Sequence, residues 1–313
     1  MQDKYLGCMI GSALGDAIGE IAQHKNLTNL QEICYNYPLT YTDDTAMSIG
    51  VSEFLLSGDL STKNLGDIFL KNLNKEPWRG YGGTQNVFYV AEQTGISYEE
   101  ACKKVDAAFY HGEGSYGNGS AMRIAPAALY FHNKPNFSEM IKLISKIDHS
   151  HPMAIDGAVI LAWAVSYLLS NPLVNTDAMC DFLISKSETK EFKTNMQFIK
   201  EAIKNNCPAA EVDAQLGNVS RSITDASKSV PYAIYSFLAH PKSFEDCITT
   251  AISTQGDADT IGAMAGALSG AFLGIKNIKP NWISILENIN LIKNIAQDIF
   301  VYPNNKASIS AFV

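Results

Sequence analysis

Residues 256–273 read GDADTIGAMAGALSGAFL, an acidic turn that leads into a run of small and apolar residues with helical character. A glycine inside a helix costs about 1 kcal/mol relative to alanine, so several glycines in one helix indicate that another backbone comes close. We therefore predict a helix over 260–273 that packs tightly in the centre of the fold. Its small residues are Gly262, Ala263, Ala265, Gly266, Ala267, Ser269, Gly270 and Ala271.

A second glycine-rich helix is predicted at 4–19. Apolar residues recur there with the spacing of a helix face, and the same argument from glycine places this helix in the protein centre. The apolar positions are Tyr5, Leu6, Met9, Ile10, Ala13, Leu14, Ala17 and Ile18. The small positions are Gly7, Gly11, Ser12, Gly15 and Gly19.

The rest of the chain also favours helices, because almost no segment alternates with the period of two that a strand requires. A capping box at Ser97-Tyr98-Glu99-Glu100 predicts a helix that reaches about residue 110. Loops are expected at 25–40 and 217–228. The predicted fold is all-α, a single compact multi-helix domain over residues 1–313. Further helices are expected at 44–57, 62–74, 83–93, 119–131, 153–170, 176–186, 189–205, 208–216, 230–239, 243–254, 281–288 and 290–299.

Composition excludes some classes of partner. The formal charge of −8 argues against broad binding to nucleic acid or to an anionic membrane. The six cysteines include no C-x-x-C pair, which is typical of reduced thiols in an intracellular protein. Asp156 interrupts the most apolar region, and the N-terminus lacks the pattern of a signal peptide. We expect a cytoplasmic protein with no direct nucleic-acid or membrane partner, and favour a monomer.

Two acidic segments carry the most distinctive chemistry: Tyr41-Thr42-Asp43-Asp44-Thr45 and Gly256-Asp257-Ala258-Asp259-Thr260. Carboxylate and hydroxyl oxygens are hard ligands suited to Mg²⁺, Mn²⁺ or Ca²⁺. Asp43 and Asp44 are consecutive, so they can serve one cluster only where the backbone is not yet helical. Asp257 and Asp259 are two residues apart, so in an extended segment both would point to the same side. We therefore predict that the two segments meet and hold divalent metal.

Helix capping is the alternative explanation for both segments, because Asp and Thr are favoured N-caps. Capping needs only one side chain at each helix end, so two dense acidic segments exceed what it requires. A helix N-terminus also disfavours a cation, so several carboxylates would have to hold the metal. Asp16 and Glu20 share a helix face and could be a solvated stripe, although the apolar neighbours of Asp16 favour a role near the metal.

A glycine-rich stretch, Gly112 to Gly119, could fold into a loop whose N–H groups face an anion, or it could be a plain flexible turn. It is neither a Walker loop nor a Rossmann fingerprint, because it lacks the Gly-Lys-Ser/Thr ending of the first and the preceding strand of the second. Of the two histidines in Asp148-His149-Ser150-His151-Pro152, His151 is expected to cap the next helix and His149 could donate to a ligand oxygen.

Taken together and in order, five blocks resemble the ADP-ribosylglycohydrolases. The blocks are Gly15-Asp16-Ala17-Ile18-Gly19, Tyr41 to Met47, Arg79-Gly80-Tyr81-Gly82, Gly114 to Arg123, and Gly256 to Ile261. The resemblance implies a compact all-α fold and a centre of two Mg²⁺ ions, or Mn²⁺. The ligands at matching positions would be Thr42, Asp43, Asp44, Asp257, Asp259 and Thr260.

The resemblance also implies where ADP-ribose binds. The diphosphate cradle would be formed by Gly114, Ser115, Tyr116, Gly117 and Asn118, and His149 would close on the ligand. The Arg-Gly-Tyr-Gly block is most similar to the serine-type branch, which also acts on poly(ADP-ribose) and O-acetyl-ADP-ribose. One position departs from the family pattern: the glutamate expected four residues after Gly19 is Gln23 here. Glutamine cannot act as a general base, which leaves Glu20 or Asp44 as the catalytic carboxylate.

Two functions follow as hypotheses. The first is metal-dependent hydrolysis of the glycosidic bond at C1″ of ADP-ribose, which releases ADP-ribose from a modified protein or a small conjugate. The second, motivated by Gln23, is a metal-dependent ADP-ribose-binding module with little or no turnover. A prenyl-diphosphate enzyme is excluded because its Asp-Asp-x-x-Asp motif would need an aspartate where Met47 stands.

Overall fold

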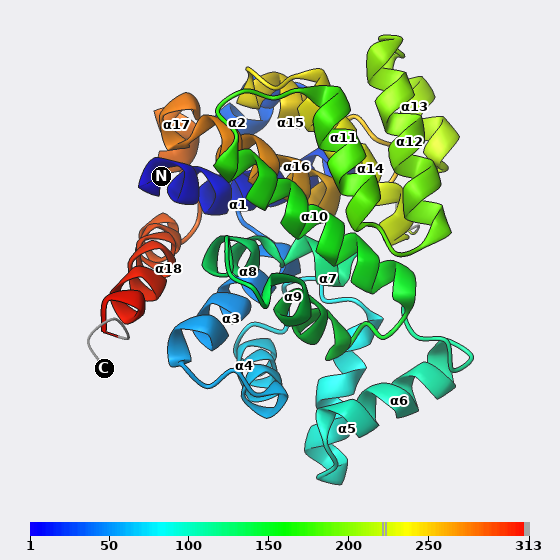
Figure 1. The fold of residues 1–313 in the computed structure, drawn as a ribbon, viewed down its shortest axis with the longest axis vertical. Coiled ribbons are helices and arrows are strands. Elements are labelled where there is room, and N and C mark those ends of the chain that lie inside the picture. The colour runs from blue at the N-terminus through cyan, green and yellow to red at the C-terminus, as the bar shows by residue number, and fades with distance from the viewer. Residues whose placement is uncertain (221, 223, 310–313) are drawn as a thin grey trace.

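Two antiparallel helices, α1 (Gln2–Lys25) and α16 (Ala258–Leu273), form the centre of the computed structural model (Figure 1). Their backbones touch at four successive turns, where α1 presents a glycine to a carbonyl of α16. A Cβ on Gly15 would lie 1.9 Å from the carbonyl oxygen of Gly262, and one on Gly11 would lie 2.4 Å from that of Gly266. No side chain fits at either distance, so both predicted central helices are confirmed.

The remaining helices surround this pair, and the structure describes residues 1–220, 222 and 224–309, with side chains described as far as Tyr302. In that part of the chain there is no strand, only isolated bridges between Leu39 and Leu286 and between Gly117 and Asp225. The surrounding helices are α2 (Leu30–Asn36), α3 (Asp43–Ser57), α4 (Thr62–Lys75), α5 (Asn86–Thr94), α6 (Tyr98–Phe109), α7 (Gly119–Met122), α8 (Ala125–Tyr130), α9 (Phe137–Lys146), α10 (Pro152–Ser170), α11 (Thr176–Lys186), α12 (Lys190–Lys204), α13 (Ala209–Leu216), α14 (Ala226–Ala239), α15 (Phe244–Ile252), α17 (Pro280–Ser284) and α18 (Ile289–Ile309), with the short 3-10 helices η1 (Gly83–Gln85) and η2 (Ile275–Asn277).

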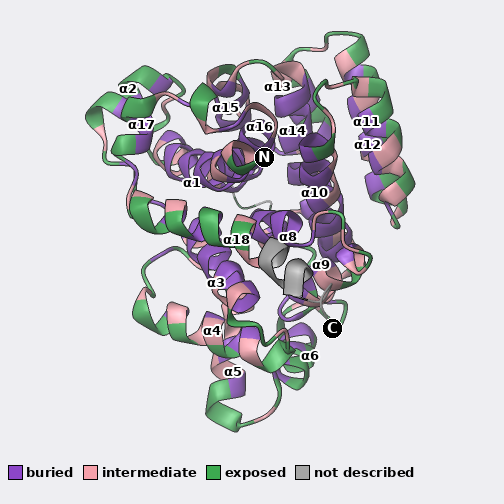
Figure 2. Cartoon of the chain, turned by 60° about the vertical axis from the view of Figure 1, so that its left-hand side comes forward, coloured by how far each residue is buried: buried purple, intermediate pink, exposed green. Residues whose placement is uncertain are grey.

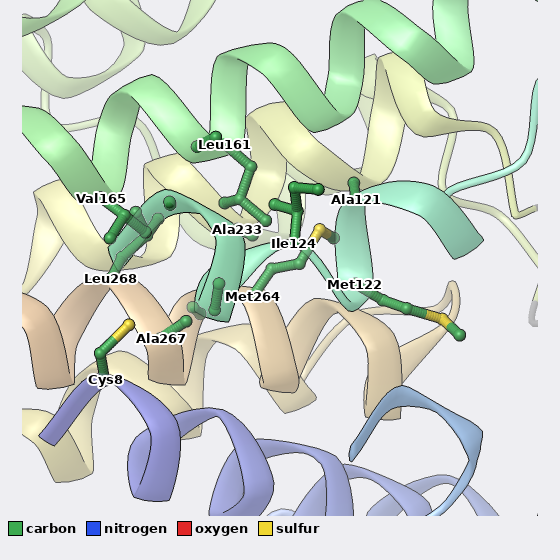
Figure 3. Close-up of a cluster of buried hydrophobic side chains, with 14 of the residues drawn as sticks. Cys8, Ala121, Met122, Ile124, Leu161, Val165, Ala233, Met264, Ala267 and Leu268 are labelled. Atoms are coloured by element: carbon green, nitrogen blue, oxygen red, sulfur yellow. The ribbon is translucent and has the colours of Figure 1, made fainter. Parts of the chain in front are cut away.

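The hydrophobic core lies between the central pair and its neighbours. Figure 2 shows α1, α10 and α16 buried on almost every side, whereas α4, α11 and α12 expose one face to solvent. In Figure 3, side chains from α10, α14 and α16 meet those of α7 and the N-terminal part of α1. The labelled residues are Cys8, Ala121, Met122, Ile124, Leu161, Val165, Ala233, Met264, Ala267 and Leu268.

Most predicted helices are present, with shifted ends. The Ser97 capping box is confirmed, and the Ser243 hydroxyl accepts from the Asp246 amide at the start of α15. His151 caps α10 as expected, since its Nδ1 accepts from the amide of Met153. The C-terminal helices differ from prediction: α17 is shorter than expected, and α18 extends ten residues further than expected, to Ile309.

Three expectations are wrong, each for a local physical reason. The expected loop at 25–40 contains α2, which begins where Asn29 accepts from two backbone amides. The expected helix 119–131 is two helices, because Pro126 has no N–H to donate to the preceding turn. Helix α14 begins at Ala226 rather than 230 and accommodates Pro231, since Asn195 donates to the Ser227 carbonyl that Pro231 cannot reach.

By length and composition alone, α10 could cross a membrane, which the sequence analysis did not anticipate because it treated Asp156 as an interruption. In the fold, 78% of its most apolar window is buried inside the protein. The Asp156 carboxylate is itself buried and accepts from the amides of Glu188 and Thr189, so it holds the segment just before α12, which Thr189 caps. We therefore describe α10 as a core helix.

Candidate active site

The two acidic segments come together at the N-termini of α3 and α16. The antiparallel packing of α1 on α16 places the second half of α1 beside the start of α16, and α3 packs against both helices. Asp43, Asp257 and Asp259 line one cleft, together with Thr260. The predicted meeting of segments more than two hundred residues apart is therefore confirmed by the structure.

Asp16 holds the first acidic segment in place, a role that the sequence analysis left open. Its fully buried carboxylate accepts from the amide and the hydroxyl of Thr42, at 3.0 and 2.8 Å. It also accepts from the amide and the hydroxyl of Thr45, at 3.0 and 2.6 Å. A side chain of α1 thus caps α3 from across the core, which frees Asp43 and Asp44 from that task.

Capping does not account for the acidic residues. Neither Thr42 nor Asp257, the residues at the N-cap positions of α3 and α16, makes a side-chain cap bond to its own helix. Asp257 instead accepts from the side-chain amide of Asn118 at 2.9 Å, and Oδ1 of Asp44 is buried without any hydrogen-bond partner. Only Asp259 accepts from a nearby backbone amide, that of Thr260.

The carboxylates strongly perturb one another. Burial raises the pKa of Asp43 to about 8, and the charges of Asp259 and Asp16 add to that effect. Burial and the neighbouring carboxylates also raise the pKa values of Asp44 and Asp259 well above the usual range. The pKa of Asp16 rises to about 7, mainly through burial, although its threonine donors oppose the shift. A cluster of this kind needs bound protons or a bound cation to offset its negative charge.

The chemistry of these donors fits a divalent cation. Hard oxygen atoms of Asp43, Asp257, Asp259 and Thr260 line the cleft. Thr42 and Asp44 lie behind them: the Thr42 hydroxyl donates to Asp16 and to Asp44, and the unpartnered oxygen of Asp44 is the kind of atom that a metal would satisfy. In the described part of the chain, no group of three or more Asp, Glu, His or Cys side chains is arranged so that it could hold a metal ion. The match to a divalent cation therefore rests on the kinds of donor atoms present and on the Asp44 oxygen that has no hydrogen-bond partner.

The cleft beside the carboxylates encloses about 940 Å³, counted to its open mouth. The glycine-rich loop forms one wall through Ser115, Gly117, Asn118 and Gly119, and Thr224, which the sequence analysis missed, lies next to it. Apolar side chains from α3, α4, α5 and α7 form the opposite wall. These are Ala46, Met47, Phe69, Leu73, Phe88 and Met122. A cleft lined by apolar side chains with a few polar groups among them is typical of a small-molecule site.

The loop conformation requires its glycines. Gly114 has a φ of +86°, and a Cβ there would lie 2.0 Å from the hydroxyl oxygen of Ser150. The segment around Thr224 fixes the loop from outside: the Asn118 amide donates to the Thr224 carbonyl at 2.7 Å, and the Ala226 amide donates to that of Tyr116. Tyr116 itself is half exposed, and its ring meets that of His151 edge-on. The loop is therefore anchored rather than a plain flexible turn.

His149 is buried at the back of the loop. Its Nδ1 lies 2.9 Å from the Asp148 carboxylate, and its Nε2 points to the loop, 3.0 Å from where a Cβ on Gly119 would lie. Asp148 also receives two hydrogen bonds from the guanidinium of Arg123. Burial opposes ionisation of Asp148, but the charges of Arg123 and His149 hold its pKa well below the usual range. Neither Arg123 nor Asp148 was identified from sequence.

Arg79 braces the first acidic segment from the other side. Its buried guanidinium donates to the carbonyl of Tyr41, lies 4.0 Å from the Tyr41 ring centre, and forms two hydrogen bonds with Glu287 and one with Glu76. The turn at 79–83 is therefore fixed at its first residue. Gly80, with a φ of +88°, then carries the chain along the cleft.

Glu20 is near enough to the carboxylate cluster for its charge to add to the raised pKa values of Asp43 and Asp259, but it is not among the residues that line the cleft. It is partly buried. Its Oε2 accepts from the side-chain amide of Gln23 at 2.8 Å, and its Oε1 lies 3.1 Å from Nε2 of His24. Gln23 thus contacts the carboxylate that was expected to replace it.

The chain is similar to known proteins over nearly its whole length. A sequence profile described as ADP-ribosylglycohydrolase matches residues 1–308. The chain is 29% identical to ADP-ribosylhydrolase ARH3 of Gallus gallus, over 89% of this chain and 88% of that protein. It is 26% identical to the ADP-ribosyl-[dinitrogen reductase] glycohydrolase of Rhodospirillum rubrum, over 92% of this chain and 91% of the other.

The fold is shared with a solved structure titled ADP-ribosylglycohydrolase-related protein complex. The TM-score is 0.71 at 23% identity, and the match covers 96% of this chain and 97% of that one. That likeness supports the all-α fold. With the profile match, it leads to one identification: the chain belongs to the ADP-ribosylglycohydrolase family.

Proposed function

We propose that this protein is a metal-dependent hydrolase that cleaves the glycosidic bond at C1″ of ADP-ribose and so releases ADP-ribose from a modified protein or small conjugate. The observation that carries the proposal is the buried carboxylate cluster. Its members Asp43, Asp257 and Asp259 line the cleft that the glycine-rich loop also lines, and Asp44 in the same cluster has an oxygen without a hydrogen-bond partner. Family membership supports the glycohydrolase class, and the donor chemistry supports the metal.

Two Mg²⁺ or Mn²⁺ ions would be held by the six predicted ligands, Thr42, Asp43, Asp44, Asp257, Asp259 and Thr260. When bound, such ions orient the hydroxyl groups of a ribose and stabilise charge that develops during cleavage. The side chain of Asn118, which already donates to Asp257, links this cluster to the loop. The glycine-rich loop would bind the diphosphate through donors other than the N–H groups of Gly117 and Asn118, which donate to the Ser115 hydroxyl and to the Thr224 carbonyl.

The chain's own contribution to the chemistry is positioning and proton transfer. Glu20 would take a proton from water as the water oxygen bonds to C1″ and the bond from C1″ to the leaving oxygen or nitrogen breaks. The proton taken by Glu20 passes to the leaving group, which departs as the alcohol of serine, the guanidine of arginine or acetic acid, and the other product is ADP-ribose. Asp44 is the other carboxylate that could accept the proton, and its burial and neighbouring charges give it a raised pKa.

The test is release of free ADP-ribose from serine-linked, arginine-linked and O-acetyl substrates, followed by chromatography with Mg²⁺, with Mn²⁺ and with EDTA. We expect release that requires metal and is lost in Asp259→Asn. A matched control is Asp298→Asn, at an exposed position of α18 outside the cleft. Absence of release from every substrate would remove the hydrolase proposal.

The alternative is a module that binds ADP-ribose without turnover, and Gln23 is the observation that favours it. A glutamine, which cannot act as a general base, stands where a glutamate is expected. Calorimetry separates the two functions: tight ADP-ribose binding with no release from any substrate supports the module. Turnover gained by Gln23→Glu would support it further, because it would show that only the base was missing.

A further inference from the structure

Three charged or titratable residues form a continuous buried chain behind the glycine-rich loop. Arg123, between α7 and α8, donates to both oxygens of Asp148, at 2.8 and 2.5 Å, and Asp148 contacts Nδ1 of His149 at 2.9 Å. Their exposed fractions are 0, 1 and 3%. Arg123 is itself fixed, because it also donates to the Ile144 carbonyl and lies over the ring of Phe69.

This arrangement decides which nitrogen of His149 is available. An ionised carboxylate only accepts hydrogen bonds, so Nδ1 must carry a proton where it meets Asp148. Nε2 is then the nitrogen that faces the cleft, and it points at the backbone of Gly117 and Gly119. With a second proton on Nε2, the ring would be a charged donor beside the glycine-rich loop.

The pair also explains why the ring keeps one orientation. The two-pronged bond from Arg123 fixes both oxygens of Asp148, so the carboxylate cannot turn away from His149. Loss of either partner would leave a buried charge without its counter-ion. The ring fits against the loop because Gly119 has no Cβ, which would lie 2.9 Å from Cε1 of His149.

We propose that Arg123 and Asp148 are positioning residues for anion recognition: they hold His149 so that a protonated Nε2 binds the diphosphate of the ligand in the cradle. The inference rests on the proposed function only in that the cleft binds ADP-ribose. It does not depend on turnover. An ion pair that only stabilised the core would not change ligand binding through His149. In the proposed role, Arg123 and Asp148 affect ADP-ribose affinity through the orientation of the His149 ring.

The first measurement is the state of the His149 ring, from nitrogen-15 NMR of protein labelled at its six histidines and assigned with His149→Gln. We expect a proton on Nδ1 in the free protein and protons on both nitrogens with ADP-ribose bound. In Asp148→Asn, the doubly protonated form should be lost. A ring that carries its only proton on Nε2 in the wild-type protein would overturn the proposal, and so would a ring unchanged by ADP-ribose.

The second measurement is a double-mutant cycle on ADP-ribose affinity by calorimetry. Asp148→Asn and His149→Gln should each weaken binding by about tenfold or more, the range for a charged hydrogen bond. Asp148→Asn should add little in the His149→Gln background, because its effect passes through that ring. Full additivity of the two losses would contradict the proposal.

Thermal unfolding of each variant controls for the fold. If Asp148→Asn does not fold, His149→Gln still tests whether Nε2 binds the diphosphate, because it leaves the Arg123–Asp148 pair intact. Unchanged ADP-ribose affinity in His149→Gln would overturn that assignment. Failure of the hydrolase proposal has a separate signature, which is ADP-ribose binding with the expected His149 dependence but no release from any substrate.

Discussion

The side-chain amide of Gln23 donates a 2.8 Å hydrogen bond to Glu20, one turn earlier on α1. Together with His24 on the other oxygen, it holds the Glu20 carboxylate at the end of α1 that lies beside the acidic cluster. A carboxylate held by two neighbours keeps its direction, which a proton acceptor requires. Where the family pattern has a glutamate, this chain has Gln23, and Gln23 helps to orient a different carboxylate, that of Glu20, one turn earlier.

Glu20→Gln tests that role. It keeps the shape of the side chain but removes the proton acceptor, so we expect the catalytic rate constant to fall by about 10²–10⁴-fold with ADP-ribose affinity nearly unchanged. Rates and calorimetric affinities should be measured in parallel. Glu211→Gln, at an exposed position of α13, is the matched control. An unaffected rate would transfer the base role to another carboxylate, with Asp44 the first to test.

Asp259→Asn should abolish metal-dependent turnover and weaken metal binding, yet leave the fold intact. The variant removes one charge from a cluster of mutually repelling carboxylates, so without metal it should unfold at a higher temperature than the wild-type protein. Calorimetric titration with Mn²⁺ measures the loss of metal affinity, and thermal unfolding in EDTA measures the change in unfolding temperature without metal. Wild-type metal affinity in this variant would show that Asp259 is not a ligand.

Stability without metal should decrease as the pH rises. Asp16 and Asp43 have pKa values raised to about 7 and about 8, so the folded protein binds protons that the unfolded chain has already lost. Stability from these groups is therefore present near pH 4, the ordinary carboxyl range, and is lost progressively up to about pH 8. Unfolding in EDTA at pH 5 and pH 8.5 should show the loss, and added Mg²⁺ should reduce it. Equal stability at both pH values would refute the clustering.

Gly15→Ala should destabilise the protein and reduce turnover together. The added Cβ would lie 1.9 Å from the carbonyl oxygen of Gly262, so α1 and α16 would have to separate. Overpacking of this kind costs about 1–3 kcal/mol, against which the helix preference of alanine gives back about 1 kcal/mol. Denaturant unfolding measures the cost. Gly82→Ala is the control, because nothing lies within 4 Å of its added Cβ; equal effects of both would argue against the tight interface.

Local chemistry was enough to predict much of the fold. The glycines of 4–19 and 260–273 predicted close backbone approach, and helical periodicity with caps such as Ser97 and Ser243 predicted most elements. The failures were also local in origin. Asn29 was not recognised as a cap, and the effect of Pro126 on the helix after Asn118 was overlooked. Short helices depend on such single residues, so pattern reasoning locates them least well.

The types and order of the residues in the two acidic segments and the glycine-rich loop were sufficient to predict the kind of site, because ligand hardness and backbone freedom are properties of the residues themselves. The support around the site was not predictable in this way. Asp16 across the core from Thr42, Arg79 on Tyr41 and Arg123 on Asp148 join residues 25 or more positions apart. A charged side chain is also stable when it is solvated at the surface, so the residue type alone does not show whether it pairs in the core. Its role depends on which partner the folded chain brings within hydrogen-bond distance and on the exclusion of water there.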